Sequence, residues 1–511
     1  MKMNSIKGWL GLIFAATLLF SGCKKDSNGG PNIPNPDPGP GTVAIETQWR
    51  NVFAQLLMTD IYLWNKEAAE KILVQGLDYA TEEDPIAFYD KMAYSADKWS
   101  EMTGDLKSFK AQFSGTETTF GYLLRFGRFT GTNTVFAVVA YVYPNTPADV
   151  AGIKRGDIIV GFNGQSIVMN DPENPGVESD NWRDLYYLPS ISLEMGVHNV
   201  ENDSVGPDGR TLSLTAREMY EDPIQYYTVL EEHGKKIGYL CYTNYILDPF
   251  NDAHGKLLGV FSEFKSAGVD DVVLDLRYNG GGYALTSVLL SNILAPKSAL
   301  DAQKVMTVEQ WNMTYDPHFG GSTHFSNQIK YEYEGKTYTD QIVNMDLSRV
   351  YVLTSGNTAS ASESTIVGLK PYMDVILVGS PTSGKFCGGI IFDRESYSGT
   401  ENISALENWG AYTMVYQFTN VNNDRFPNGF APEIENTVSE DLMNAYPFGD
   451  TRDPLLGRAL ELITGQTYLS PEVRSGGGSA YPMIPAEHVS VNRFDGKLID
   501  LRKPELSGEN L

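Results

Sequence analysis

The sequence predicts a multidomain protein that mixes helices and strands, of the α/β or α+β class. A chain of 511 residues is too long for one compact core, so several domains are expected. Residues 45–102 repeat apolar side chains at helical spacing, and from residue 236 onward short apolar runs alternate with helical stretches. The part of the chain between these two regions has strand-like patterns. These patterns predict a small helical N-terminal domain, a β domain and an α/β domain, in that order.

Composition and charge limit the classes of function. Hydrophobic residues make up 42% of the chain and charged residues 20%, as in ordinary folded proteins. The formal net charge of −25 argues against a nucleic-acid partner, because phosphate binding needs clustered Lys and Arg. Cys241 and Cys387 are too far apart in sequence to indicate a disulfide framework or a zinc site. No metal or organic cofactor is expected.

The first residues are typical of an export signal. Lys2 and Lys7 precede an apolar run over residues 9–20, and small residues follow this run directly. A basic start, a short apolar stretch and small residues make up such a signal, and the run is too short to span a membrane. Residues 1–22 are therefore interpreted as a signal peptide.

Cys23 follows Ser21-Gly22, a pattern that resembles a bacterial lipobox, in which the cysteine is lipidated and becomes the mature N-terminus. Phe20 departs from the aliphatic residue that is usual there, and a plain secretory signal with an incidental cysteine is the alternative. Residues 23–43, rich in Gly, Pro and Asn, cannot build a core and are interpreted as a flexible tether. The resemblance implies export and a lipid anchor in a bacterial outer membrane, on its periplasmic or surface side.

Helical spacing places the N-terminal domain at residues 44–112. Apolar residues here recur on one face of a helix, and such stripes are usually core, so no chemistry is assigned to this domain. The stripe consists of Trp49, Phe53, Leu56, Leu57, Tyr62 and Leu63.

Residues 113–220 are predicted to form the β domain. Residues 135–142 are an apolar run of strand type. Thr146 and the proline after it are suited to begin a short helix, and Gly152 is suited to end it. Residues 157–162 then form a strand that ends in an Asn-Gly hairpin turn.

The run from Tyr143 to Gly164 resembles the second half of a PDZ domain, a module that binds the C-terminal ends of polypeptides. Phe120-Gly121-Tyr122-Leu123 then falls where that family places its carboxylate-binding loop. A glycine turn presents N–H groups to a terminal carboxylate, and the next strand edge accepts the peptide by β-addition. A β domain used only as a spacer is the alternative.

Residues 221–470 are predicted to form the α/β domain. Its strands are continuous apolar runs, as expected where helices cover both faces of a sheet. Residues 471–511 form a C-terminal tail to which the sequence assigns no structure. The predicted strands are residues 237–242, 272–276, 350–353 and 375–378, and the predicted helices are residues 252–267, 360–369 and 454–463.

Three segments of the α/β domain carry the candidate chemistry. Asp275-Leu-Arg-Tyr-Asn-Gly-Gly-Gly282 joins a strand end to a glycine turn. Thr354-Ser-Gly-Asn-Thr-Ala-Ser-Ala-Ser-Glu363 joins a strand to a helix, and Gly379-Ser-Pro-Thr-Ser-Gly-Lys-Phe-Cys-Gly-Gly389 is a glycine-rich turn with one lysine. In this order, behind a PDZ-like pattern, they resemble peptidase family S41, the C-terminal processing or tail-specific proteases. The resemblance covers residues 120–463 and implies a ClpP/crotonase-like α/β catalytic domain.

The resemblance implies that Ser360 is the nucleophile and Lys385 the general base. A hydroxyl attacks only if a base takes its proton, and a lysine can serve if burial lowers its pKa. Ser360 should lie at a helix N-terminus, which favours developing negative charge. The N–H of Ala361 and one N–H from Gly280 or Gly281 would form the oxyanion hole.

Several features leave the details of the site open. Ser362 is a rival nucleophile two positions on. Gly389 stands where the family commonly has a Gln that orients the lysine amine, so either another side chain does this or activity is weak. None of the six histidines lies in a motif, which disfavours a Ser-His-Asp arrangement. Arg277 is interpreted as a support of the glycine loop through an ion pair, and Glu363 as a support of the helix start.

The predicted function is that of a serine endopeptidase. It would hydrolyse polypeptides through an acyl-enzyme at Ser360 and select them by their C-terminus through the PDZ-like domain. A non-catalytic peptide-binding lipoprotein with the same fold is one alternative, and the missing Gln favours it. An acyl hydrolase that acts on small esters or lipids with the same dyad is the other.

Overall fold

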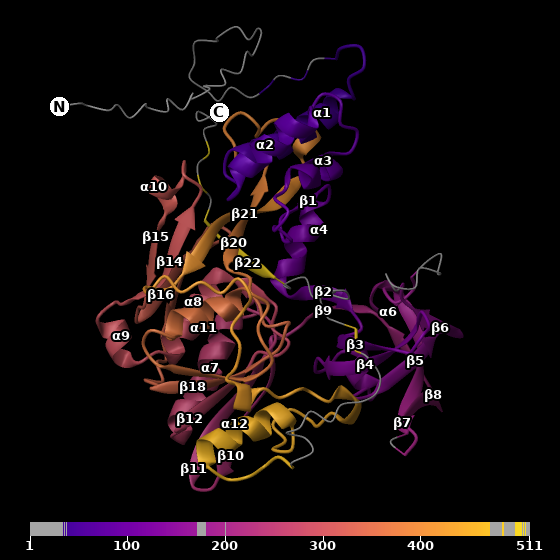
Figure 1. The fold of residues 1–511 in the computed structure, drawn as a ribbon, viewed down its shortest axis with the longest axis vertical. Helices are drawn as coiled ribbons and strands as arrows, with labels where there is room; N and C mark the ends of the chain where they lie inside the picture. Colours follow the sequence, from indigo (N-terminus) through magenta and orange to yellow (C-terminus); the bar gives the residue numbers. More distant parts are fainter. Residues whose placement is uncertain are drawn as a thin grey trace, which may run out of the picture.

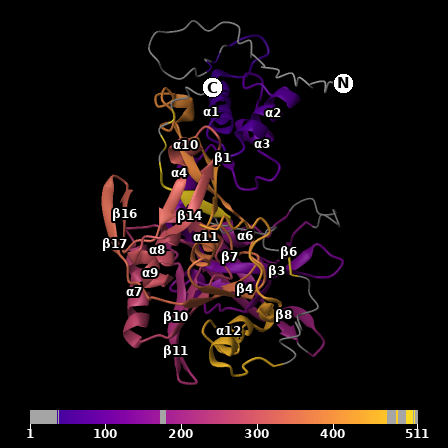
Figure 2. The same ribbon diagram turned by 60° about the vertical axis from the view of Figure 1, so that its left-hand side comes forward.

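The structure is a computed structural model that describes residues 34, 36, 38–170, 180–199, 201–470, 483–484, 496–502, 504 and 506. It confirms the predicted mixture of helices and strands in several domains. The N-terminal helices lie at one end of the molecule, the β domain projects to one side, and the α/β domain forms the other end (Figure 1, Figure 2). Within the described ranges, no helix is long and apolar enough to cross a membrane. The predicted signal peptide and Cys23 lie outside the described residues.

The N-terminal helices share one hydrophobic core with the α/β domain. Phe53 and Leu57 are buried in the same cluster as Leu274 and Ile366. Asp84 begins one of the helices by accepting hydrogen bonds from two N–H groups of its first turn. The elements of this region are α1 (Ile45–Thr59), α2 (Asn65–Gln75), α3 (Pro85–Met92), β1 (Glu101–Thr103), α4 (Leu106–Ala111) and the 3₁₀ turn Gln112–Ser114.

The β domain is a six-stranded sheet with its own core. Thr146 accepts a hydrogen bond from the helix that it precedes, as predicted, and Gly152 has a φ of +82° just after that helix. The strand order is β3-β4-β6-β5-β7-β8, so β3 is an edge strand. The elements are β3 (Tyr122–Arg128), β4 (Thr134–Val142), α5 (Pro147–Val150), β5 (Ile158–Phe162), β6 (Gln165–Val168), α6 (Asp184–Tyr187), β7 (Ser190–Asn199) and β8 (Ser204–Thr215), and β2 (Thr116–Thr119) pairs with β9 (Arg217–Tyr220) beside them.

The central sheet of the α/β domain has the order β10-β11-β12-β18-β19, parallel except for β10 at one edge. One core cluster packs α12 against one face, and another packs α7, α8 and α11 against the opposite face. Helices thus cover both faces, as predicted. The elements are β10 (Ile224–Glu232), β11 (Lys235–Tyr242), α7 (Ala253–Ala267), β12 (Asp271–Asp275), α8 (Ala284–Leu294), β18 (Arg349–Thr354), α11 (Ala361–Leu369), β19 (Asp374–Gly379) and α12 (Pro454–Thr464).

A second sheet, which the sequence did not predict, lies beside the first. Its order is β13-β22-β20-β21-β14-β15, and β1 of the N-terminal region pairs with β21. The strand β22 comes from the C-terminal tail. The strands are β13 (Gly281–Tyr283), β14 (Val305–Trp311), β15 (Gly321–His324), β20 (Cys387–Asp393), β21 (Gly410–Thr419) and β22 (Lys497–Asp500). The remaining elements are α9 (Lys297–Asp301), α10 (Asp316–Phe319), the hairpin of β16 (Gln328–Tyr333) with β17 (Lys336–Gln341), and the 3₁₀ turns Ser404–Leu406, Ile434–Asn436 and Leu442–Asn444.

Candidate active site

Three neighbouring parallel strands end beside one another and carry the candidate residues. The glycine turn follows β12, Ser360 follows β18 and begins α11, and Lys385 follows β19. Because the carboxyl ends of parallel strands meet at one edge of a sheet, this topology brings the three sequence motifs together.

Ser360 is held in a strained backbone conformation at the start of α11. Its φ is +62° and its ψ is −108°, values that a residue with a side chain rarely adopts. The side chain is buried, and its Oγ has no hydrogen-bond partner among the described residues. A buried hydroxyl without a partner is costly, so this position is one where a functional reason is expected.

The glycine turn lies directly against Ser360. A Cβ on Gly281, whose φ is +124°, would come within 2.9 Å of the Cβ of Ser360, so only glycine fits here. The N–H of Gly281 already donates to Oδ1 of Asn279 at 3.0 Å. In the part of the chain that the structure describes, the N–H groups of Gly280 and Ala361 have no partner. This arrangement favours Gly280 over Gly281 as the second donor of an oxyanion hole.

Lys385 is completely buried among aromatic rings. Its Nζ donates a hydrogen bond to the backbone carbonyl of Gly496 and lies 3.4 Å from the hydroxyl of Tyr412. The same nitrogen lies 5.2 Å from the ring centre of Trp99 and 5.4 Å from that of Tyr412. Burial lowers the pKa of Lys385 to about 7, and the nearby charge of Lys497 acts in the same direction.

Glu363 connects the start of α11 with the lysine turn. Its Oε2 accepts hydrogen bonds from the N–H groups of Ser360 and Lys385, each at 2.9 Å. Its Oε1 accepts from the hydroxyl of Thr382 at 2.6 Å and from the N–H of Gly384 at 2.7 Å. Burial raises the pKa of Glu363 to about 7, although these hydrogen bonds act in the opposite direction. One carboxyl group therefore fixes the backbone of both candidate residues, which is the support at the helix start that was predicted.

Tyr412 fills the space next to Gly389, the position at which a Gln was expected. A Cβ on Gly389 would lie 2.7 Å from the ring of Tyr412. The hydroxyl of Tyr412 also donates to the carbonyl of Leu498 at 3.0 Å and accepts from the N–H of the same residue at 3.1 Å. Tyr412, Trp99 and Gly496 surround the lysine amine, and sequence reasoning missed all three because they come from β21, the N-terminal region and the tail.

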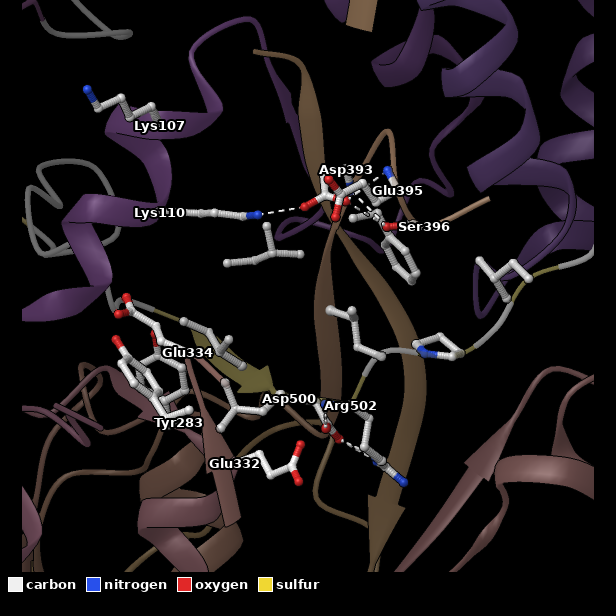
Figure 3. Close-up of a pocket in the computed structure, with 18 of the residues that line it drawn as sticks. Lys107, Lys110, Tyr283, Glu332, Glu334, Asp393, Glu395, Ser396, Asp500 and Arg502 are labelled. Atoms are coloured by element: carbon white, nitrogen blue, oxygen red, sulfur yellow. Dashed lines mark hydrogen bonds and ion pairs between the residues drawn. The ribbon is translucent and has the colours of Figure 1, made fainter. Parts of the chain in front are cut away.

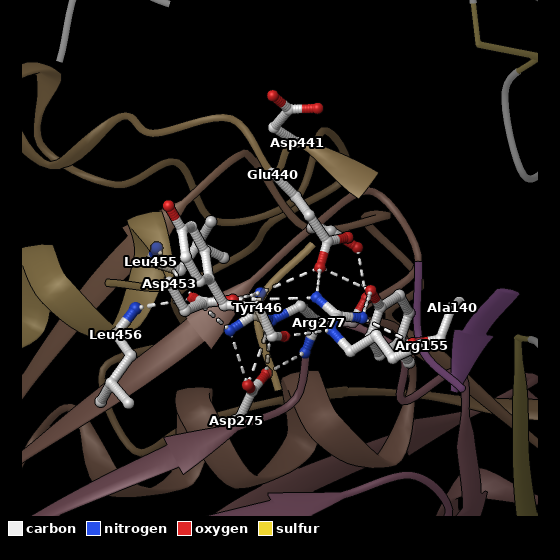
Figure 4. A network of polar contacts seen from close by, with 12 residues as sticks. Ala140, Arg155, Asp275, Arg277, Glu440, Asp441, Tyr446, Asp453, Leu455 and Leu456 are labelled. Atoms are coloured by element: carbon white, nitrogen blue, oxygen red, sulfur yellow. Dashed lines mark hydrogen bonds and ion pairs between the residues drawn. The ribbon is translucent and has the colours of Figure 1, made fainter. Parts of the chain in front are cut away.

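Arg277 supports the glycine turn from behind, which confirms the predicted ion pair. Its guanidinium bonds to Asp275 at 2.8 Å, to Asp453 at 2.9 Å and to Glu440 at 2.9 Å (Figure 4). Arg155, from the β domain, bonds to the same Glu440 at 2.5 Å. Although burial raises the pKa of Glu440, the charges of Arg155 and Arg277 hold it at about 2. This network ties the β domain and the start of α12 to the loop that precedes the glycine turn.

Ser362, the rival nucleophile considered from the sequence, has a hydrogen-bond partner of its own, and so does a buried histidine. The hydroxyl of Ser362 donates to the carbonyl of Asn279 at 3.1 Å. His254 is buried, and its ring nitrogens lie 2.6 Å from Asp340 and 2.9 Å from Thr286. Both nitrogens of this histidine therefore have partners other than Ser360.

The predicted carboxylate-binding loop lies at the start of the edge strand β3. Phe120, Tyr122 and Leu123 are buried, and Gly121 has a φ of +85° with Thr146 packed against it. The N–H of Gly121 donates to the hydroxyl of Thr119 at 2.8 Å. The N–H of Leu124 donates to the hydroxyl of Tyr186 at 2.9 Å. Side-chain hydroxyl groups therefore accept hydrogen bonds from one N–H of the predicted loop and from the N–H just after it.

A cavity of about 1000 Å³ opens beside the second sheet, bordered by α4, β20, β22 and the β16–β17 hairpin (Figure 3). Its wall carries charges of both signs, among them the ion pair of Lys110 with Asp393 and that of Arg502 with Asp500. Ser360 and Lys385 do not line it. Both residues are 0% exposed.

Comparison with known protein families agrees with this geometry. Residues 236–432 match the model of peptidase family S41, and residues 138–173 match that of a PDZ domain. These ranges contain the three motifs and the hairpin on which the resemblance was based. The chain therefore contains a domain similar to peptidase family S41 with a PDZ domain before it, which supports a serine-type peptidase.

A solved structure shares the fold. The chain is similar to an S41 protease from Bacteroides fragilis NCTC 9343, with 25% identity, a TM-score of 0.62, and coverage of 81% of this chain and 97% of the other. It also matches a photosystem II D1 C-terminal processing protease with 18% identity, a TM-score of 0.42, and coverage of 76% of this chain and 92% of the other. A search of curated proteins found no match.

Proposed function

We propose that the chain hydrolyses peptide bonds with Ser360 as nucleophile and Lys385 as general base. The observation that carries this proposal is the state of Ser360. Its Oγ is buried, has no partner among the described residues, and sits at a positive φ beside the glycine turn. The rival hydroxyl of Ser362 is hydrogen-bonded to a carbonyl, which supports the choice of Ser360.

The chain's own groups fit each step of acyl transfer. Neutral Lys385 would take the proton of Ser360 as Oγ bonds to the substrate carbonyl carbon, and the carbonyl oxygen would receive N–H donors from Ala361 and Gly280. The lysine ammonium would then give its proton to the leaving amine. Water would hydrolyse the acyl-enzyme, with Lys385 acting again as base. A lysine pKa of about 7 suits both roles near neutral pH.

We further propose that the PDZ domain selects polypeptides by their C-terminus through Phe120, Gly121, Tyr122 and Leu123. The position of β3, which begins there, at the edge of its sheet supports this proposal. A carboxylate would replace the hydroxyl of Tyr186 as the acceptor for the N–H of Leu124.

We also propose that Cys23 carries a lipid that anchors the exported protein to a bacterial membrane. The sequence of the first residues supports the anchor.

The experiment that tests the catalytic proposal is to incubate the purified chain with a fluorophosphonate probe and to map the labelled residue. We expect the label on Ser360, no label in Ser360→Ala, and retained labelling in Ser362→Ala. An unfolded protein should be cleaved, and Ser360→Ala should abolish that cleavage. Labelling at Ser362, or hydrolysis of small esters without cleavage of polypeptides, would overturn the proposal.

A further inference from the structure

The strand β22 of the C-terminal tail fills the gap between the two sides of the candidate active site. It pairs parallel to β13, which follows the glycine turn, with Lys497 opposite Gly281 and Ile499 opposite Tyr283. It also pairs parallel to β20, which follows Lys385. Within the sheet, β13 and β20 are therefore joined through a short strand from the end of the chain.

The backbone of this strand reaches the reacting groups themselves. The carbonyl of Gly496 accepts the hydrogen bond of the Lys385 amine, and the N–H of Gly496 donates to the carbonyl of Gly280 at 2.8 Å. A Cβ on Gly281 would lie 2.4 Å from the carbonyl oxygen of Lys497 and 3.3 Å from Oγ of Ser360. A peptide link of the tail thus lies beside the nucleophile, the oxyanion loop and the base at once. Neither Ser360 nor Lys385 is exposed while it is there.

We propose that the gap between β13 and β20 is a binding site for an extended polypeptide strand, and that residues 496–500 of this chain occupy it in place of substrate. This inference rests on the proposed function, because it takes Ser360 as the nucleophile. Pairing with backbone on both sides is the β-addition mode, in which main-chain hydrogen bonds hold the peptide and side-chain contacts select it. The lysine amine, now bound to Gly496, becomes available to Ser360 when the strand leaves.

The side chains of the strand indicate which polypeptide the site accepts. Lys497 forms an ion pair with Glu101 and lies 4.8 Å from the ring centre of Tyr412. Leu498 and Ile499 are each 2% exposed and pack into the main core. The site is therefore suited to an extended segment with a basic residue followed by two aliphatic ones.

Two further features suggest that the polypeptide-binding site extends beyond Ser360 and Lys385 in both directions. Met483 of the same tail forms an antiparallel bridge with Gly127, and the N–H of Ile484 donates to the carbonyl of Phe126 at 2.8 Å. Both contacts are on β3, the edge strand of the PDZ domain. At the other end, the cavity of Figure 3 is lined by β22 from Ile499 onward, so a longer peptide has room to continue there.

A binding experiment tests this inference without requiring catalysis. The full chain carrying Ser360→Ala is combined with Gly496→Val, whose Cβ would lie 2.7 Å from the ring of Trp99 and should expel the strand. Gly234→Val is the matched control, because this glycine also has a positive φ (+78°) but nothing within 4 Å. The probe is a fluorescent peptide with the sequence of residues 496–502, followed by anisotropy.

We expect the peptide to bind at least tenfold more tightly to the Gly496→Val chain than to the control. Leu498→Asp, which places a charge in the core, should have the same effect by a different route. Equal, weak binding in all three folded chains would show that β22 is a fixed strand of the sheet and would overturn the inference. Thermal unfolding of each chain establishes that it is folded.

A second measurement separates this inference from the proposed function. With Ser360 intact, Gly496→Val should increase the rate of fluorophosphonate labelling at least tenfold over Gly234→Val, and added peptide should reduce it again. Tighter peptide binding without any label at Ser360 supports the strand-binding site and contradicts Ser360 as nucleophile. Labelling that is slower in Gly496→Val than in the control contradicts displacement of the strand.

A charge exchange tests the preference for a basic residue. In the Gly496→Val chain, Glu101→Lys should weaken binding of the peptide at least fivefold. A peptide that carries Lys497→Glu should bind this variant better than it binds the chain with Glu101. Unchanged binding in both combinations would contradict the assignment of Glu101 as the residue that selects a cation.

Discussion

At the residue scale, burial determines what Lys385 can do. A lysine in water has a pKa of about 10.4 and is almost fully protonated at neutral pH. In the folded chain the amine is surrounded by aromatic rings and one carbonyl, and burial lowers the pKa to about 7. The folded protein therefore binds fewer protons than the unfolded chain between these two values. Base strength at neutral pH is obtained at the expense of folding stability.

Lys385→Met should consequently stabilise the fold, by roughly 1–4 kcal/mol at pH 6. The lysine binds a proton more readily in the unfolded chain than in the folded one. The buried amine therefore lowers the unfolding free energy of wild type by the full amount below about pH 7, and this destabilisation decreases as pH rises toward 10. The free energy of unfolding in urea, measured for both chains from pH 6 to 9, should show a difference that shrinks with pH. A difference that grows with pH, or a variant less stable than wild type at pH 6, would contradict a desolvated amine.

At the element scale, the strands that sequence reasoning found are those buried between helices. β12 and β18 have continuous apolar centres, and the junctions after them contain the motifs, so these elements and the meeting of the three motifs were predictable. The second sheet was not, because β13 is three residues long and begins with two glycines. Its partner β22 is far away in sequence, and pairing between such distant segments leaves no local signal. The aromatic residues around Lys385 could not be predicted for the same reason, because they are also distant from it in sequence.

Glu363→Gln should loosen the junction between α11 and the lysine turn. Its two oxygens accept four hydrogen bonds, whereas an amide offers one oxygen and places an NH₂ group against other donors. We expect a loss of about 1–3 kcal/mol in unfolding free energy and at least tenfold slower probe labelling. Glu70→Gln, on the exposed face of α2, is the control and should change neither. Wild-type labelling in Glu363→Gln would show that the carboxyl group does not position Ser360.

At the scale of the whole molecule, a network of buried ion pairs connects the PDZ domain with the α/β domain. Arg155 in the first and Arg277 in the second share Glu440, and this buried network lies directly behind the glycine turn. The part of the PDZ domain around Arg155 therefore has a physical connection to the loop that precedes the glycine turn. The sequence predicted the order of the domains and the support by Arg277. It did not predict the link through Arg155, because the two arginines meet only in the folded chain.

If the PDZ domain selects C-terminal ends, amidation of a substrate's terminal carboxylate should weaken its binding about tenfold, because the N–H donors lose a charged acceptor. The comparison uses two peptides that differ in this group alone, with affinities measured on the Ser360→Ala chain. Equal affinity for the acid and the amide would reject selection by the C-terminus.

A lipid on Cys23 would place the whole molecule at a membrane. Cys23→Ser should then release the protein into the soluble fraction with an unchanged unfolding temperature, because acyl chains contribute about 0.8 kcal/mol per buried CH₂ to membrane binding. Cell fractionation with a high-salt wash checks this. A variant that stays with the membrane after the wash contradicts the anchor.

The measurement that tests the central claim most directly is the rate of fluorophosphonate labelling at Ser360 as a function of pH, in wild type, Lys385→Met and Lys385→Arg. In wild type the rate should rise with pH through about 7, as the amine loses its proton. In both variants it should be at least a hundredfold lower, since neither a thioether nor a guanidinium accepts a proton here. Labelling that is unchanged in either variant, or that falls from pH 6 to 9 in folded wild type, would contradict Lys385 as the base.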